Sequence, residues 1–272
     1  MFKIFCAISL AFSSSLLASN PANPLLYVTQ VPMPDEINNR TASATRLSCA
    51  SAIQNPLGDT RSAGRGGALM LRMPNGTVRN LTKEAGFGLG ASSTGNATGA
   101  QDGAGIAVQH PFVNWDATRA IFSMAVGAPS GAADTTIFYW QLYEVTNLPQ
   151  VLAGAAAQIA AVPNQPANYN NLHACYGTNG RIIFTSDQPR GGLVSLYPQR
   201  DEYLLQPINT GLWSIDPTVA GGNLRHLVHA PSGIFQPFVD HAGRLLFIQW
   251  DHLSRDVEAV TDRTPIPANG DA

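Results

Sequence analysis

The chain has 272 residues, of which 44% are hydrophobic and only 12% are charged, and its formal net charge is −2. A hydrophobic share of this size excludes wholesale disorder, and the near-neutral charge gives no basic surface for binding nucleic acid. With 25 glycines and 19 prolines, the composition favours many short strands and turns over long helices.

Residues 1–22 are predicted to be a secretory signal peptide. A single Lys3 precedes an apolar stretch from Ile4 to Ala18, and small, turn-forming residues follow it. This stretch is shorter than the roughly 20 apolar residues that span a bilayer. An uncleaved membrane anchor is the alternative interpretation. We expect export, so that the mature protein would be periplasmic or secreted and would have no membrane span.

Export would leave two cysteines, Cys49 and Cys175, because Cys6 lies within the signal peptide. An oxidising compartment permits a disulfide between them, but two buried free thiols explain the pair equally well. The sequence has no C-x-x-C-H motif, which covalent haem attachment requires. We therefore expect no cofactor in this chain.

The glycine-rich segment 86–105 interrupts the first part of the chain. It is not a phosphate-binding loop, because no Lys-Ser or Lys-Thr pair follows it. Its Gly, Ser and Asn content is typical of a flexible surface insertion.

Three segments share the pattern Arg-x-Ile/Leu-Phe, and they begin at Arg119, Arg181 and Arg244. Successive arginines are 62 and 63 residues apart, and self-similarity on this scale indicates a repeat architecture. A turn-rich segment precedes each arginine and a short apolar run follows it, which predicts strand, turn and strand. The arginine itself could fix the hairpin through backbone carbonyls or a nearby carboxylate, or it could simply be a solubilising charge at a strand edge.

Further strands are predicted within each unit, so that one unit holds about four strands in about 63 residues. Repeated four-stranded antiparallel sheets are how a β-propeller is built. A β-sandwich is the less favoured alternative, because sandwiches lack an internal period. We therefore predict an all-β fold with blades over residues 23–260 and a polar tail at 261–272. Aromatic strands are predicted at 138–146 and 210–217, and closing strands at 77–82, 149–154 and 223–228.

Several of these segments resemble known propeller families. Residues 181–192, 210–217 and 237–253 look like the repeat of TolB-type propellers. A closer resemblance is carried by residues 25–34, 65–82, 162–171 and 196–203. These segments resemble the propeller-bearing alpha subunit of hydrazine synthase, and the resemblance covers nearly all of the mature chain, from about Leu25 to Arg255. It implies an exported, six-bladed propeller with c-type haems carried by further domains. In hydrazine synthase those haems serve the joining of nitric oxide and ammonium.

Two departures from that family limit what can be carried over. Without C-x-x-C-H, no haem-binding residue transfers to this chain, and catalysis by this chain alone is not expected. The units begin near Leu25, His110, His173 and Gln236, and the last one stops after its first hairpin. Three to four blades would form an incomplete ring of a six-bladed propeller. Either the chain is a fragment of a longer protein or it pairs with another copy.

Candidate catalytic residues cluster in the last unit, where carboxylates and imidazoles could bind a cation or supply a base. Aspartates in propeller hairpins also cap turns through backbone hydrogen bonds, which is the structural alternative. The candidates are Asp240, His241, Asp251 and His252.

A second candidate site, for an anionic ligand, is formed by Asp187 and Arg190, although the same segment also reads as a loop-forming turn. No metal site is expected, because His226 and His229 are three residues apart on a predicted strand and point to opposite faces.

Two functional hypotheses follow. The first is a non-catalytic β-propeller module for docking or ligand binding, with other subunits or domains of an exported redox assembly as its partners. The second is a hydrolase or lyase whose Asp/His site lies at the mouth of the propeller channel.

Overall fold

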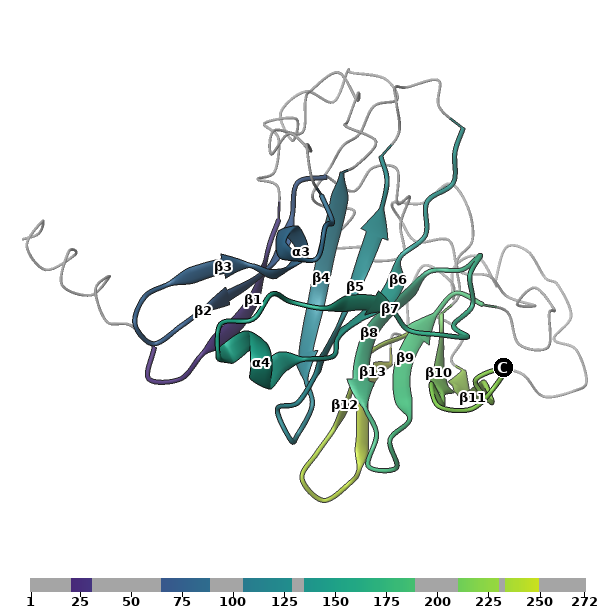
Figure 1. The fold of residues 1–272 in the computed structure, drawn as a ribbon. Coiled ribbons are helices and arrows are strands. Elements are labelled where there is room, and N and C mark those ends of the chain that lie inside the picture. The colour runs from purple at the N-terminus through teal and green to yellow at the C-terminus, as the bar shows by residue number, and fades with distance from the viewer. Residues whose placement is uncertain are drawn as a thin grey trace, which may run out of the picture.

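The structure is a computed structural model that describes residues 21–30, 65–88, 105–128, 135–188, 210–229 and 233–249. In these ranges the protein consists mainly of strands, which form four antiparallel sheets of two to four strands. The all-β prediction is therefore confirmed. We number the sheets 1 to 4 in chain order; Figure 1 shows their arrangement.

Consecutive strands are neighbours in every sheet, so each sheet is an up-and-down meander. Sheet 1 contains β1 (Leu25–Thr29), β2 (Ala68–Arg72) and β3 (Val78–Asn80). Sheet 2 contains β4 (Ile106–Val113), β5 (Ala120–Val126), β6 (Gln141–Val145) and β7 (Ile159–Ala161). Sheet 3 contains β8 (Asn171–Tyr176), β9 (Ile182–Ser186), β10 (Gly211–Ile215) and β11 (Arg225–His229), and sheet 4 contains β12 (Ile234–Val239) and β13 (Leu245–Gln249).

Most of the predicted strands are present. The repeated Arg-x-Ile/Leu-Phe pattern leads into β5, β9 and β13, each the second strand of its sheet. The predictions at 138–146, 210–217 and 223–228 correspond to β6, β10 and β11. The strand predicted at 77–82 stops at Asn80, because the side chain of Asn80 accepts the backbone N–H of Lys83 and caps a short helix, α3 (Leu81–Glu84).

The strand predicted at 149–154 is wrong, because this segment lies in the helix α4 (Leu148–Leu152) and the short loop after it. Pro149 lies in the first turn of α4, where its fixed φ suits a helix and no amide donor is needed. Leu148 and Val151 are three residues apart and both are buried, as one face of a helix requires. The fourth strand of sheet 2 is instead β7.

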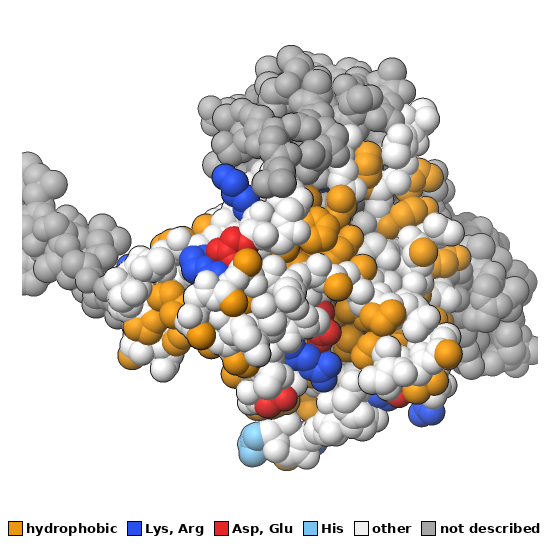
Figure 2. Space-filling view, viewed as in Figure 1, with side chains coloured by type: hydrophobic (Ala, Val, Ile, Leu, Met, Phe, Trp, Pro, Cys, Tyr) orange, Lys and Arg blue, Asp and Glu red, His pale blue; other side chains and the backbone are white. Residues whose placement is uncertain are grey.

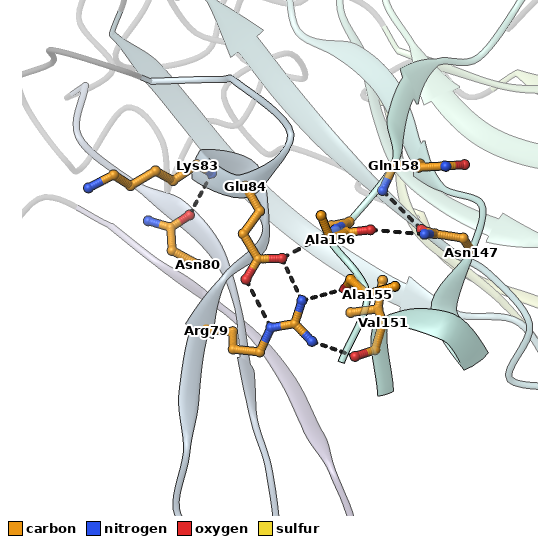
Figure 3. A network of polar contacts seen from close by, with 10 residues as sticks. Arg79, Asn80, Lys83, Glu84, Asn147, Val151, Ala155, Ala156 and Gln158 are labelled. Carbon is orange, nitrogen blue, oxygen red and sulfur yellow. Dashed lines mark hydrogen bonds and ion pairs between the residues drawn. The ribbon is translucent and has the colours of Figure 1, made fainter. Parts of the chain in front are cut away.

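A polar cluster joins sheet 1 to the α4 region of sheet 2. Arg79 donates hydrogen bonds to both carboxylate oxygens of Glu84, at 2.9 and 2.6 Å. The same guanidinium donates to the backbone carbonyls of Val151 and Ala155, as Figure 3 shows. The hydrogen bond from Arg79 holds the pKa of Glu84 below its ordinary value, so the pair stays charged at neutral pH.

The repeat seen in the sequence is also a repeat of backbone conformation. His110, His173 and Gln236 have positive φ angles of 54°, 52° and 50°, and they are spaced 63 residues apart. Each lies at a β-bulge in the first strand of its sheet, where the register with the second strand shifts. Positive φ is uncommon for residues other than glycine, and an extra residue in a strand accounts for it.

The hairpin after each bulge repeats as well. The backbone N–H of Asn114, Gly177 or Asp240 donates to the carbonyl of the repeated arginine that ends the turn. These three hairpins therefore have the same closing hydrogen bond, and in each the arginine directly precedes the second strand.

The sheets pack on one another in chain order. Strand β4 lies against β1 and β2, β8 lies against β4 and β5, and β12 lies against β8 and β9. Three apolar clusters fill the spaces between successive sheets, centred on Phe122, Phe184 and Ile183. The sheets can stack in this way because the second strands are apolar on both sides. One side of each strand faces the preceding sheet, and the other side faces the next.

The repeated arginines differ in what they bind. Arg119 lies 3.5 Å from the carboxylate of Glu144 and over the ring of Tyr176, whose hydroxyl also donates to Glu144. Buried Arg181 donates to the side chain and carbonyl of Ser214, at 3.1 and 3.0 Å, and to the carbonyl of residue 223. Arg244 is exposed and binds Asp240 in its own hairpin at 2.7 Å. The arginines therefore bind both backbone carbonyls and carboxylates, but of these three only Arg244 fixes its own hairpin in this way.

No helix within the described ranges is long and apolar enough to cross a membrane.

Candidate functional site

The two ends of the sheet stack carry different connections. At one, the hairpin end, short turns join β2 to β3, β4 to β5, β8 to β9 and β12 to β13. At the other, the loop end, the strand ends are joined through residues 30–67, 85–105, 127–140 and 187–210. Binding residues concentrate on loops that a rigid scaffold positions. The loop end is therefore the part of the molecule best suited to recognition.

Two histidines meet where bulges interrupt the first strands of sheets 2 and 3. The ring centroids of His110 and His173 are 3.8 Å apart, and the ring planes are inclined at 53°. Phe235, from the first strand of sheet 4, packs edge-on against His173 with a centroid distance of 6.3 Å. The repeated bulge thus brings side chains of three successive sheets into contact.

Burial controls the charge of this histidine pair. It lowers the pKa of His110 to about 4. It also lowers the pKa of His173 well below the ordinary value, and the neighbouring His110 adds to this effect. Both imidazoles are therefore neutral at neutral pH, and each has one N–H donor and one acceptor nitrogen.

Several polar atoms around the pair have no hydrogen-bond partner within the described residues. They are Nδ1 of His110 and of His173, both amide atoms of Gln109, and Oγ of Ser123. Gln109 stands opposite Ser123 in the β4–β5 register, and both side chains are buried. We call these four residues the bulge site. Buried polar groups are normally paired with protein or with ordered water. The bulge site therefore offers hydrogen bonds to water or another small neutral molecule.

Asp187, a predicted ligand-binding residue, follows β9 at the loop end. Its two carboxylate oxygens accept the backbone N–H and the side-chain amide of Asn170, both at 2.7 Å. Burial raises the pKa of Asp187 to about 6, although the hydrogen bonds from Asn170 oppose that rise. Asp187 therefore fastens the segment before β8 to the end of β9. Its predicted partner, Arg190, lies outside the described residues.

Asp240 and His241, two of the four predicted catalytic residues, lie in the β12–β13 hairpin at the hairpin end. One oxygen of Asp240 accepts the backbone N–H groups of Ala242 and Arg244, at 2.9 and 2.8 Å, and the other accepts the Arg244 side chain. These hydrogen bonds lower the pKa of Asp240. Its carboxylate therefore serves as a turn cap. Asp251 and His252 lie outside the described residues.

Cys175 is a free thiol, fully buried between sheets 3 and 4. Burial raises its pKa to about 12, which a hydrogen bond from the backbone of Val239 only partly offsets. Such a thiol is unreactive as a nucleophile. Cys49, residues 1–20, most of the glycine-rich segment and the tail lie outside the described residues.

Sequence reasoning used His110 and His173 only as the starts of repeat units and missed their contact. The signal was present, because His110, His173 and Gln236 recur at 63-residue intervals in the strand before the repeated arginine. Among the side chains that the structure describes, no three His, Cys, Asp or Glu residues come together as a group that could hold a metal ion.

Neither protein-family models nor curated protein sequences match this chain.

Proposed function

We propose that the four sheets are blades of a β-propeller, and that the chain serves as a non-catalytic docking or ligand-binding module of an exported redox assembly. The observation that carries the proposal is the recurrence of one bulge, one hairpin and one sheet-to-sheet contact at 63-residue intervals. This recurrence supports a propeller, because propeller blades are repeated antiparallel sheets that each pack on the one before.

The contrast between the two ends of the stack supports recognition as the role of the module. The hairpin end is closed by the repeated short turns, whereas the strand ends at the loop end are joined through the long connections. Near the loop end lie Asp187, with its carboxylate bound to Asn170, and His173, the third residue of β8. The redox setting rests on the resemblance to the alpha subunit of hydrazine synthase. The expected partner is therefore a polypeptide that carries c-type haem.

The alternative, a hydrolase or lyase, has less support. The carboxylate of Asp240 already accepts three hydrogen bonds inside its own hairpin. A general base needs a free lone pair directed at the substrate. Asp240 would have to break the hairpin contacts before it could act in that way.

Site-specific photo-cross-linking tests the docking proposal. A photoreactive residue replaces Ile137, which is 67% exposed in the connection before β6 at the loop end. The matched control places it at Val219, which is 44% exposed in the turn after β10 at the hairpin end. In the exported fraction of the host, Ile137 should cross-link to a polypeptide that peptide sequencing shows to contain C-x-x-C-H. Cross-links to unrelated proteins, or equal cross-linking from both positions, would contradict the proposal.

A further inference from the structure

The last sheet of the stack has an apolar face with no sheet against it among the described residues. Phe238 of β12 stands opposite Leu246 of β13, and the two side chains are 43% and 52% exposed. Ile248 is 53% exposed, and Phe238 contacts the rings of Phe112 in β4 and Trp115 in the β4–β5 hairpin, with centroid distances of 6.2 and 6.5 Å. We call Phe238, Leu246 and Ile248 the sheet 4 outer face.

The same positions are buried in the earlier sheets. Leu246 lies two residues after its repeated arginine, as do Ile121 in sheet 2 and Ile183 in sheet 3. Ile121 is 0% exposed against sheet 3, and Ile183 is 9% exposed against sheet 4.

Phe238 corresponds to Phe112 in sheet 2 and to Cys175 in sheet 3, each two residues after the bulge residue. Phe112 is partly buried against sheets 3 and 4, and Cys175 is fully buried. The sheet 4 outer face is therefore the surface on which the next sheet packs everywhere else in the stack.

The first sheet also has an outer face with no sheet against it among the described residues. Leu69 and Leu71 of β2 face sheet 2, so the alternate residues of sheet 1 face away from the stack. This sheet 1 outer face includes Leu25 and Val78, which are 51% and 49% exposed and both stand opposite Arg72 in the strand register. Figure 2 shows hydrophobic side chains at the surface over sheet 1. Sheets 2, 3 and 4 each pack on the sheet before them with the corresponding face.

We propose that two copies of this chain associate head to tail, with the sheet 4 outer face of one copy packed on the sheet 1 outer face of the other. The contact would repeat the geometry that already joins successive sheets within the chain. Large apolar faces are seldom left in water, and a second copy supplies the matching surface. Because the two surfaces differ, the contact is heterologous. Repeating it from copy to copy gives either a closed ring or an open chain of copies. This inference rests on the proposed function and names one partner of the module.

Sedimentation equilibrium of the purified 272-residue chain tests the proposal with three variants. Leu246→Lys places a charge on the sheet 4 outer face, and Val78→Lys places one on the sheet 1 outer face, where Arg72 stands opposite and cannot neutralise it. Val219→Lys, in the turn after β10 and on neither outer face, is the matched control. The unaltered chain and the control should associate, whereas each face variant should associate at least about tenfold more weakly, because a buried unpaired charge opposes the contact.

A mixture of the two face variants distinguishes head-to-tail association from other arrangements. One contact without a lysine remains between Leu246→Lys and Val78→Lys chains, so the mixture should form one-to-one pairs and no larger species. Circular dichroism verifies folding, and Leu246→Ser with Val78→Thr repeats the comparison if a lysine variant unfolds.

Three results would overturn the proposal: a monomeric unaltered chain, loss of association in only one of the two face variants, or a mixture of the two that stays monomeric. Because this experiment uses the purified chain by itself, it can fail while cross-linking at the loop end still detects a haem-bearing partner.

Discussion

Arg181 gives the sharpest test of how the repeat is held together. Its guanidinium is buried and donates three hydrogen bonds, two to Ser214 and one to the carbonyl of Asn223. A hydrogen bond to a charged group contributes roughly 1.5–3 kcal/mol, and three from one side chain are not additive. We expect Arg181→Ala to lower the free energy of unfolding by about 3 kcal/mol, because buried acceptors on two connected segments lose their donor.

The repeat supplies its own control. Arg244 occupies the same position in sheet 4, but its side chain is 72% exposed, and its partner among the described residues is Asp240 of its own hairpin. Arg244→Ala should therefore change stability far less than Arg181→Ala, because exposed ion pairs contribute little. Urea unfolding at constant m-value measures both variants. Equal destabilisation by the two substitutions would refute the structural distinction between these arginines.

Three further outcomes are expected. Burial lowers the pKa of His110 from 6.5 to about 4, so the unfolded chain binds more protons in that range and stability should fall as the pH drops from about 6.5 to 4. His110→Asn, which tolerates positive φ, should flatten this loss in urea titrations at several pH values. For Asp187 the pH dependence of stability has the opposite sign. Burial raises the pKa of Asp187 from 3.8 to about 6, so stability should fall as the pH rises through that range. The stability of Asp187→Asn relative to the unaltered chain should therefore increase between pH 4 and 7, and a constant difference would contradict the assignment. Buried Cys175, whose pKa is raised to about 12, should react with a thiol reagent only after urea unfolds the chain, whereas rapid reaction in the folded state would show that it is accessible.

The sequence predicted the second strands well because a turn followed by a short apolar run has few other solutions. Arg119, Arg181 and Arg244 mark those strands at a fixed interval, which also predicted that sheets would stack. The segment 149–154 was misassigned because its apolar residues suit a strand or a helix face equally. Pro149, which favours the first turn of a helix, decided between them.

Only the positions of the bulge site could be predicted from the sequence. The 63-residue recurrence marks His110 and His173, but their positive φ depends on the pairing of whole strands, and no local pattern of ordinary residues encodes it. Asp240 and His241 are adjacent in the sequence, and a carboxylate beside an imidazole is a combination that suits catalysis. The backbone N–H groups that bind the Asp240 carboxylate become close only once the hairpin forms.

The exposure of the two outer faces could not be predicted from the sequence either. Leu246 has the same local sequence context as Ile183, and the sequence alone gives no reason for their difference in exposure. That difference arises because sheet 4 packs over Ile183, whereas no sheet of the described residues packs over Leu246.

The proposed head-to-tail contact continues the sheet stack from one copy of the chain into another. Hydroxyl-radical footprinting of the purified chain at low and high concentration tests this contact directly, because the reaction reports the exposure of individual side chains. Leu246 and Leu25 should lose reactivity together as the concentration rises, while the reactivity of Val219 stays unchanged. Unchanged reactivity at both leucines, or protection of Leu246 without protection of Leu25, would contradict it.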